Sequence, residues 1–151
     1  MRPPHTAKRG SDHSPGEHEL LERLGRFVLQ PPPWVQLGIG DDAAILEPDR
    51  GSLTAVSTDA LIEDVHFRRT WSSPRSIGHK ALAVALSDLA AMGAAPRASL
   101  LSLALPPGFA ATEFDELLDG FAAQTPTSGA ALVGGNIARS PGPLVVDVTV
   151  I

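Results

Sequence analysis

The chain has 151 residues, enough for one domain with its own hydrophobic core. Hydrophobic residues make up 43% of it and charged residues 19%, a composition that excludes a disordered or fibrous protein. The net charge of −5, without a Lys/Arg cluster after Arg9, argues against nucleic acid as a partner. The absence of cysteine excludes disulfides, thiolate catalysis and cysteine–zinc sites.

The sequence contains no segment typical of membrane proteins or of export. A run of about 18 apolar residues is lacking, so we expect no membrane partner. The N-terminal residues lack the apolar core of a secretory signal, and a chain without cysteine fits a reducing compartment, so we expect a cytoplasmic protein. Residues 1–15 are rich in Pro, His, Arg and Ser and predict a disordered tail, which leaves residues 16–151 for the folded domain.

The first predicted elements are a helix and a hairpin. Apolar residues recur at helical spacing within residues 16–29, and the prolines at 31–33 end this helix because proline lacks a backbone N–H. Two short apolar strands, residues 43–46 and 53–57, flank the turn signal Pro48-Asp49-Arg50-Gly51. Thr58-Asp59 is expected directly after the second strand.

The longest predicted helix covers residues 76–92. Its Ala and Leu residues favour helix, and because it is apolar on nearly all sides we expect it to be buried. A strand is predicted over residues 97–105. A second long helix follows, which Thr112 caps and which runs to about Ala123.

The last two predicted strands flank a glycine pair. Residues 130–133 lead into an expected turn at Gly134-Gly135-Asn136, and in residues 144–151 valines alternate with Asp147 and Thr149. Strands mixed with long helices predict the α/β or α+β class. Because the chain stops inside a strand pattern, we expect a second domain to be missing.

Three segments combine acidic side chains with glycine, a strand end or an apolar run. In Asp41-Asp42 two adjacent carboxylates repel each other, which is tolerable in water or beside a bound cation; a solvated turn is the alternative. Ser57-Thr58-Asp59 offers the hard oxygen ligands that suit Mg²⁺, and a helix N-cap is the alternative. Asp88 stands in an apolar helix, where a carboxylate is costly unless it is paired or metal-bound. The alternatives there are an ion pair with Lys80 or an exposed stripe.

Two further features are ambiguous on their own. The paired glycines of Gly134-Gly135-Asn136 let a backbone approach a phosphate closely, although a plain turn has the same composition. His66 is of a kind that is more often packed or solvated than a ligand. The sequence lacks the G-x-x-x-x-G-K-[ST] and G-x-G-x-x-G loops, so any nucleotide would be held by acids that bridge to its phosphates through Mg²⁺.

Taken together and in order, these segments resemble those of the thiamine-monophosphate kinase family. The resemblance covers roughly Gly16 to Ile151, and the run from Lys80 to Ala94 is its most specific part. The matching segments are Gly16-Glu17 with the Leu20-Leu21 helix, Leu37–Ala43, Ser57–Leu61, Val65–Phe67, Gly78–Val84, Leu86–Ala94 and Leu132–Asn136.

The resemblance implies transfer of the γ-phosphoryl of ATP to the phosphate of thiamine monophosphate, giving thiamine diphosphate and ADP. It also implies site residues: Mg²⁺ ligands at Asp42, Ser57, Thr58, Asp59, Asp88 and Asn136, nucleotide contacts at Gly135 and Asn136, and a thiamine monophosphate contact at His66. No catalytic residue is expected, because an acceptor that is already a phosphate anion needs no strong general base.

The resemblance further implies a fold and an assembly. The fold is the N-terminal ATP-binding domain shared with aminoimidazole ribonucleotide synthetase, a mixed sheet with helices packed on one face. The sheet pairs with that of a second subunit in a homodimer. The family normally adds a second domain, so we expect this chain alone to be nearly inactive. Asn136 departs from the family, which more often has Asp there, and an amide oxygen contributes no negative charge.

Two other interpretations stay open. Another ATP-using enzyme of the same superfamily, such as aminoimidazole ribonucleotide synthetase, selenophosphate synthetase or the hydrogenase maturation dehydratase, would share the acid-rich site. A truncated, non-catalytic domain that only dimerises or binds nucleotide would keep the fold and the ligands. The phosphoryl-transfer interpretation depends on Asp42, Asp59 and Asp88 meeting in space around divalent cations.

Overall fold

The computed structural model describes residues 15–151. The tail expected over residues 1–15 therefore lies, apart from Pro15, outside the described residues. The helices and strands, in chain order, are α1 (Glu17–Leu24), β1 (Val35–Leu37), β2 (Ile45–Leu46), β3 (Ser57–Ile62), α2 (Pro74–Ala91), β4 (Ala98–Leu105), α3 (Ala111–Ala122), α4 (Thr125–Ser128), β5 (Ala131–Arg139) and β6 (Val145–Val150).

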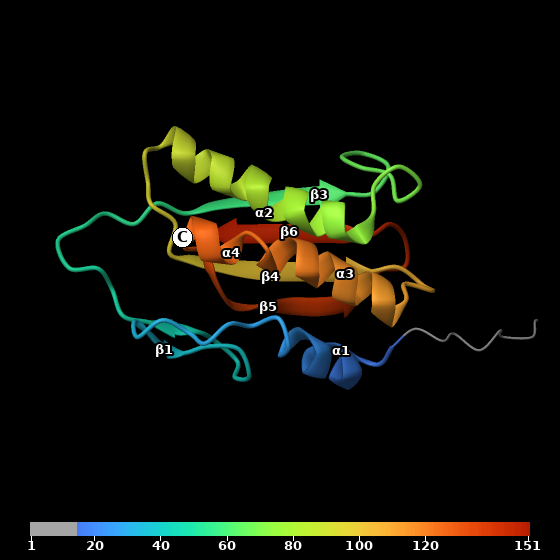
Figure 1. Ribbon diagram of the computed structural model, residues 1–151, viewed down its shortest axis with the longest axis horizontal. Helices are drawn as coiled ribbons and strands as arrows, with labels where there is room; N and C mark the ends of the chain where they lie inside the picture. Colours follow the sequence, from blue (N-terminus) through green and yellow to red (C-terminus); the bar gives the residue numbers. More distant parts are fainter. Residues whose placement is uncertain (1–14) are drawn as a thin grey trace, which may run out of the picture.

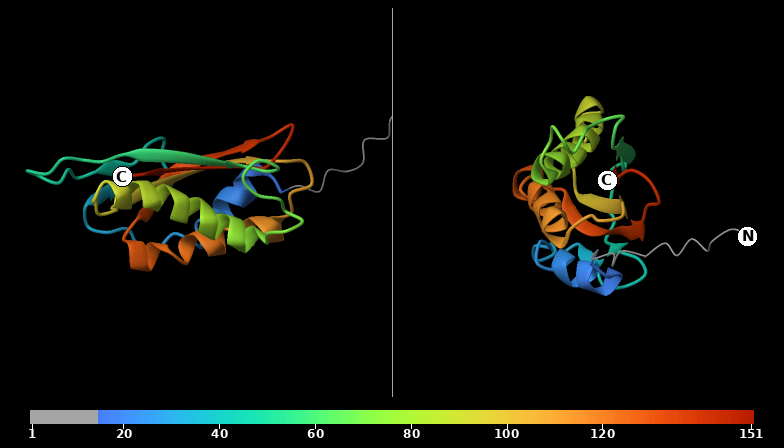
Figure 2. Two further views of the ribbon diagram at one scale, coloured as in Figure 1. Left: turned by 90° about the horizontal axis from the view of Figure 1, so that it is seen from above. Right: turned by 90° about the vertical axis from the view of Figure 1, so that its right-hand side faces the viewer.

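Four strands form the main sheet, in the order β3-β6-β4-β5. Strand β6 runs antiparallel to both β3 and β4, whereas β4 and β5 run parallel. Helices α2 and α3 pack on one face of this sheet, and no helix within residues 15–151 covers the other face (Figure 1, Figure 2). The predicted class, a mixed sheet with helices packed on one face, is confirmed.

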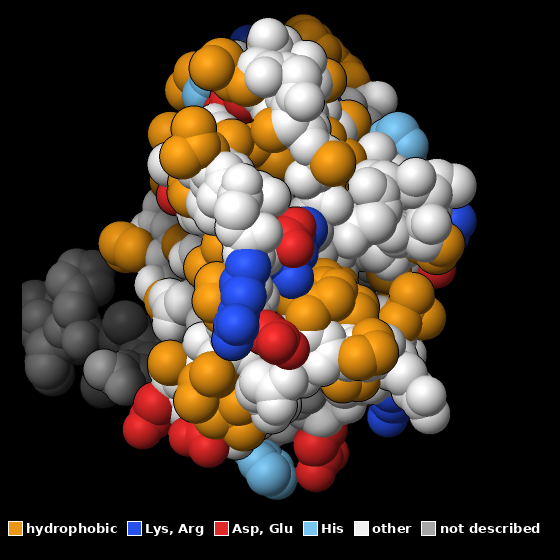
Figure 3. Space-filling model, turned by 90° about the vertical axis from the view of Figure 1, so that its left-hand side faces the viewer, with side chains coloured by type: hydrophobic (Ala, Val, Ile, Leu, Met, Phe, Trp, Pro, Cys, Tyr) orange, Lys and Arg blue, Asp and Glu red, His pale blue; other side chains and the backbone are white. Residues whose placement is uncertain are grey.

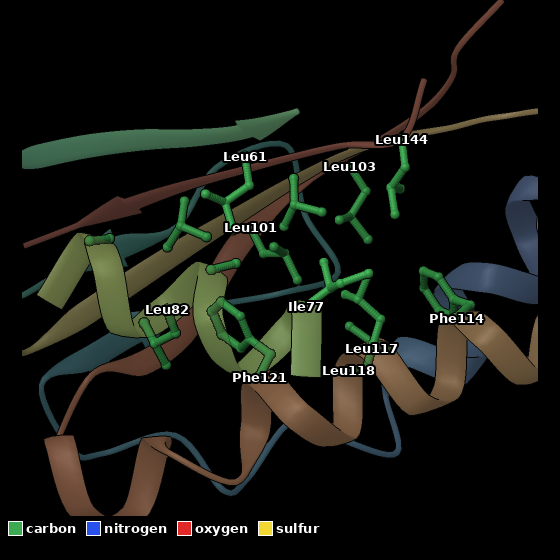
Figure 4. Packing of buried hydrophobic residues seen from close by; sticks show 14 of the residues in the cluster. Leu61, Ile77, Leu82, Leu101, Leu103, Phe114, Leu117, Leu118, Phe121 and Leu144 are labelled. Carbon is green, nitrogen blue, oxygen red and sulfur yellow. The ribbon is translucent and has the colours of Figure 1, made fainter. Parts of the chain in front are cut away.

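Alternation along the strands separates the two faces of the sheet. In β6, Val146, Val148 and Val150 are buried on the helix side, so Asp147 and Thr149 point the opposite way. Leucines of β4 and phenylalanines of α3 fill the same core (Figure 4). We call the uncovered side the open face; by strand register it carries Thr58, Ala60, Leu100, Ser102, Ala104, Gly134, Asn136, Asp147 and Thr149.

Helices α2 and α3 approach so closely that glycine is required where they meet. A Cβ added to Gly78 of α2 would lie 1.9 Å from the carbonyl oxygen of Leu117. A Cβ added to Gly120 of α3 would lie 1.9 Å from the carbonyl oxygen of Arg75. Since no side chain fits at either position, this contact brings the two helix backbones together in one dense layer over the sheet.

The first half of the chain departs from the sequence prediction. The helix expected over residues 16–29 ends at Leu24. The expected hairpin is wrong, because β2 pairs with β1, a strand that the local pattern does not predict. Strand β3 begins at Ser57 rather than ending there, since its six residues pair with β6 from Val150 to Val145. Ser57, Thr58 and Asp59 therefore lie within a strand, and the N-cap alternative for them is wrong.

The segment before β3 is irregular and partly apolar. Residues 53–56, expected as a strand, have no strand assignment. Leu53 is fully exposed and Val56 is 64% exposed. Figure 3 shows hydrophobic side chains at the surface on this side of the molecule. Apolar residues form a strand only where a partner strand satisfies their backbone, and here they lack one.

The helix expected over residues 76–92 is confirmed as α2, but it buries only one side. Ile77, Leu82 and Leu89 are buried, whereas Asp88 is exposed and Met92 is 77% exposed. Within residues 15–151, no helix combines the length and the apolar character that crossing a bilayer would need.

Two details of the second half also differ from expectation. The N-cap position of α3 is Ala110, not Thr112, and the Glu113 carboxylate accepts a hydrogen bond from the Ala110 N–H at 2.9 Å. The segment Gly134-Gly135-Asn136 lies inside β5 rather than in a turn. Pairing with β4 shifts by one residue just before it, at Val133, so a bulge precedes the glycine pair.

Candidate functional site

A cavity of about 510 Å³ lies between residues 38–46 and the open face of the sheet. We call it the open-face cavity. Its polar and glycine lining comes from segments far apart in the sequence: Gly38, Asp41, Asp42, Thr58, Ser102, Gly134, Gly135, Asp147 and Thr149. The structure therefore brings two of the predicted metal ligands, Asp42 and Thr58, and the predicted nucleotide contact Gly135 to one cavity.

The strand residues of the open-face cavity are joined by hydrogen bonds. The Thr58 hydroxyl donates to Asp147 Oδ1 at 2.9 Å. The Thr58 and Thr149 hydroxyl oxygens lie 3.0 Å apart, since these residues are opposite each other in the β3–β6 pairing. On the loop side, the Asp42 N–H donates to Asp41 Oδ1 at 2.8 Å, so the Asp41 carboxylate helps to hold the turn.

A second cavity, of about 400 Å³, borders strand β5. Asp41, Asp42, Gly134 and Gly135 line this cavity as well, and Asn136 joins them. Asp42 thus belongs to the walls of both cavities. The predicted ligand Asn136 and the predicted nucleotide contact Gly135 lie next to it, at the β5 edge of the sheet.

Ser57, Asp59 and Asp88 form a separate group on the helix side of β3. The Ser57 hydroxyl donates to Asp88 Oδ2 at 2.6 Å. Asp59 is opposite the buried Val148, which places it on the same side of the sheet. The alternative of an ion pair between Lys80 and Asp88 is wrong: the ion pairs of the described residues do not include it, and Lys80 Nζ donates instead to the His66 carbonyl oxygen at 2.7 Å.

The structure does not bring Asp42, Asp59 and Asp88 together. Asp42 lines the cavity on the open face, whereas Asp59 and Asp88 lie on the helix side of β3, so the sheet stands between them. In the described part of the chain, no group of three or more His, Asp or Glu side chains could hold a metal ion. The convergence expected from the sequence is therefore not found within a single chain.

His66 lies in the loop between β3 and α2. It is exposed, and its Nδ1 accepts a hydrogen bond from the Ile62 N–H at 3.0 Å. Neither the open-face cavity nor the second cavity, which borders β5, includes it. The structure thus leaves this predicted substrate contact at a distance from Asp42 and Thr58.

A carboxylate anchors the loop that carries His66. Glu63 Oε1 accepts from Arg69 Nε at 2.7 Å, and its Oε2 accepts from the Leu144 N–H at 3.1 Å. Burial raises the pKa of Glu63, but these two hydrogen bonds and the charge of Arg69 outweigh it, so the pKa lies below its usual value. An ionised side chain that is 14% exposed therefore holds the loop to Leu144, directly before β6.

Gly135 has a structural reason to be glycine. Its φ is 154°, and an added Cβ would lie 1.9 Å from the Leu101 carbonyl oxygen. Close pairing with β4 requires this residue whether or not a nucleotide approaches it.

Asp147 is the site residue that the sequence analysis missed. The alternation of Val146, Val148 and Val150 with Asp147 and Thr149 indicates a two-faced strand. The local pattern does not give the order of the strands in the sheet. Without that order, the sequence cannot show which residues of β3 and β5 lie on the same polar face as Asp147.

The donor atoms around the open-face cavity fit a hard divalent cation. They are carboxylate and hydroxyl oxygens, the ligands that Mg²⁺ prefers. A site with one or two carboxylates is sufficient for Mg²⁺, because the ion usually keeps several waters and binds substrate phosphates as well.

The chain is similar in sequence and in fold to several known proteins. The chain is 43% identical over 117 residues to the thiamine-monophosphate kinase of Bacillus subtilis (strain 168), covering 78% of this chain and 36% of that protein. A solved thiamine-monophosphate kinase from Stenotrophomonas maltophilia K279a has a TM-score of 0.72 and 42% identity, covering 87% of this chain and 40% of that chain. The structure of AaThiL complexed with AMPPCP and TMP has a TM-score of 0.60 and 33% identity, covering 63% and 30% respectively.

The match is to part of a longer protein. The chain spans 36% of the length of the Bacillus subtilis relative. Residues 40–151, most of the chain, match the family model described as AIR synthase related protein, N-terminal domain. The chain therefore belongs to the family of AIR synthase related proteins, whose N-terminal domain it contains over these residues.

Proposed function

We propose that residues 16–151 are the N-terminal, Mg-ATP-binding domain of an enzyme that phosphorylates thiamine monophosphate to thiamine diphosphate. The observation that carries the proposal is the open-face cavity, which Asp42, Thr58 and Gly135 line although they are far apart in the sequence. The relatives with 42–43% identity over this region are named thiamine-monophosphate kinases, and one related structure contains AMPPCP and TMP.

The chemistry of this reaction needs positioning more than proton transfer. Two anionic phosphates repel each other, and Mg²⁺, when bound, would neutralise and align them. We assign its ligands to Asp42, Ser57, Thr58, Asp59, Asp88 and Asn136, the nucleotide contacts to Gly135 and Asn136, and a substrate contact to His66. Carboxylates around a cavity, with no nucleophile or general base required, suit such a reaction.

A homodimer would complete the site. The open face carries half-buried apolar residues, Leu100 and Ala104 among them, that a second sheet could cover. Pairing two sheets about an axis parallel to the strands sets β5 of one copy over β3 of its partner. That arrangement would bring Asp42 of one copy to the β3 edge of its partner, where Thr58 lies on the open face and Ser57, Asp59 and Asp88 lie behind it on the helix side. We also propose that the protein is cytoplasmic.

A coupled assay with ATP, Mg²⁺ and thiamine monophosphate tests the function. We expect the 151-residue chain to form almost no thiamine diphosphate. A longer form that carries the rest of the relatives' length should form it at an ordinary enzymatic rate. Failure of the longer form to turn over would refute the kinase proposal, and Mg²⁺-dependent ATP binding without turnover would favour the non-catalytic nucleotide-binding domain.

A further inference from the structure

Asp147 is a carboxylate at the centre of the sheet with no role in the proposed reaction. It lies on β6, between β3 and β4, and points to the open face. Its carboxylate is half-buried and lines the open-face cavity together with Asp42. Its only described hydrogen-bond partner in the cavity is the Thr58 hydroxyl, at 2.9 Å.

The hydrogen bonds of Thr58 determine what its oxygen can bind. A threonine hydroxyl has one proton to donate and two lone pairs to accept with. The carboxylate of Asp147 can only accept, so the Thr58 proton is directed to it. The contact with Thr149, at 3.0 Å, must then use the Thr149 proton and one lone pair of Thr58. One lone pair of the Thr58 oxygen is left over, and no proton.

An oxygen in this state accepts and does not donate. A phosphate oxygen requires a donor, whereas a cation requires a lone pair, so the Thr58 oxygen suits a cation. Asp41 and Asp42 line the same cavity and add negative charge. The cavity should therefore admit a divalent cation, or a phosphate that carries one, and should repel a free phosphate.

We propose that Asp147 is a positioning residue that holds the Thr58 hydroxyl with its lone pair toward a divalent cation in the open-face cavity. The proposal rests on the proposed function, in which Thr58 is a Mg²⁺ ligand. Asp147 acts through Thr58 and is not itself a ligand. This also explains why a central strand with four valines carries a carboxylate at this register.

Equilibrium binding of Mn²⁺ to the 151-residue chain, followed by electron paramagnetic resonance, tests the proposal without any turnover. Asp147→Ala removes the acceptor, and we expect Mn²⁺ binding to weaken about tenfold, as for loss of a hydrogen bond to a charged group. Asp147→Asn keeps an acceptor oxygen, so binding should fall only about two- to threefold. Asp49→Ala removes an equal charge from the exposed turn before β3, outside the open-face cavity, and should leave binding unchanged.

A double-mutant cycle identifies the path through Thr58. In a Thr58→Val background the hydroxyl is gone, so Asp147→Ala should have almost no further effect on Mn²⁺ binding. Thermal unfolding midpoints of all variants show whether each one is folded. Because Asp147 and Thr58 are both at the surface of the open face, we expect the midpoints to change little.

Three results would overturn the inference alone. If Asp147→Ala weakens binding equally with and without the Thr58 hydroxyl, Asp147 is a direct ligand. If Asp147→Asn and Asp147→Ala weaken it equally, only the charge matters. If both Asp147 variants bind Mn²⁺ as tightly as the unaltered chain, Asp147 has no role, while the proposed metal site still stands. An unaltered chain that binds no Mn²⁺ would instead remove the metal site and this inference together.

Discussion

The two faces of one sheet differ in what their residues do. On the helix-covered face, β4 and β6 bury leucine and valine against α2 and α3. On the open face, the alternate residues of the same strands include Ser102, Asp147 and Thr149, which line a cavity with Asp42. Because successive side chains of a strand point to opposite faces, core residues and cavity residues alternate within the six residues of β6. Substitutions on the two faces should therefore change different measurements.

The largest expected effect on stability comes from a substitution that leaves a cavity on the helix-covered face. Leu103 of β4 is 2% exposed, so Leu103→Ala should lower the free energy of unfolding by about 3 kcal/mol. Leu100, on the open face of the same strand, is only half-buried, and Leu100→Ala should cost about 1 kcal/mol. Urea denaturation at low protein concentration measures both. Equal losses would mean that the two faces are not energetically distinct.

The next effect concerns the contact between the two helices above that face. Gly120→Ala should destabilise the protein by about 2 kcal/mol, because its Cβ would displace the α2 backbone at Arg75. Gly142→Ala is a matched control, since its Cβ would meet only Ser140 Oγ at 4.0 Å. Thermal denaturation compares the two. A Gly120→Ala variant as stable as the control would show that the helices separate without cost.

A smaller effect on stability is expected at Glu63, in the loop between β3 and α2. Glu63→Gln should lower the free energy of unfolding by about 1 kcal/mol, because a neutral amide binds Arg69 and the Leu144 N–H more weakly. The folded pKa of Glu63 lies below its unfolded value, so its contribution is fully present above the unfolded pKa. It is lost as the pH falls through the folded pKa.

Unfolding free energies measured between pH 6 and pH 3 test this linkage. The difference between the unaltered protein and Glu63→Gln should shrink as the pH falls, because protonation makes the two side chains alike. Arg50→Gln, in the exposed turn before β3, is a control that should show no such trend. A difference that stays constant with pH would exclude the ionised state of Glu63 as its cause.

The elements with strong local signals could be predicted from the sequence. The helix α2, the helix α3 and the alternating strand β6 all lie close to their expected ranges. The hairpin before β3 could not, because pairing of β1 with β2 depends on contacts that a short apolar run does not encode. The glycine pair of β5 was also open to two interpretations, since its close approach to Leu101 is visible only in three dimensions.

The candidate site was predictable by residue type but not by grouping. Asp42 and Thr58 were candidates from their residue types and from the family resemblance, and they share the open-face cavity. Asp59, next to Thr58 in the chain, points to the other side of the sheet because adjacent strand residues alternate. A prediction that places Thr58 and Asp59 after the end of a strand cannot assign them to opposite faces, and it cannot connect Thr58 to Asp147.

The smallest expected effect on stability is at the loop of the open-face cavity. Asp42 is exposed, so Asp42→Asn should change the free energy of unfolding by less than about 0.5 kcal/mol. The same change should weaken Mn²⁺ binding, because it removes a charged oxygen from the walls of both cavities.

Asp41→Asn is the control for that prediction, since the two carboxylates are adjacent and equally charged. The Asp41 carboxylate accepts a hydrogen bond from the Asp42 N–H, and an asparagine side-chain oxygen can accept the same bond. Asp41→Asn should therefore keep the turn, and it should weaken Mn²⁺ binding less than Asp42→Asn does. If Asp41→Asn weakens Mn²⁺ binding more than Asp42→Asn does, Asp41 is the cation ligand and Asp42 is not. If neither variant weakens Mn²⁺ binding, the cation binds elsewhere. The open face would then differ from the helix-covered face in composition but not in cation binding.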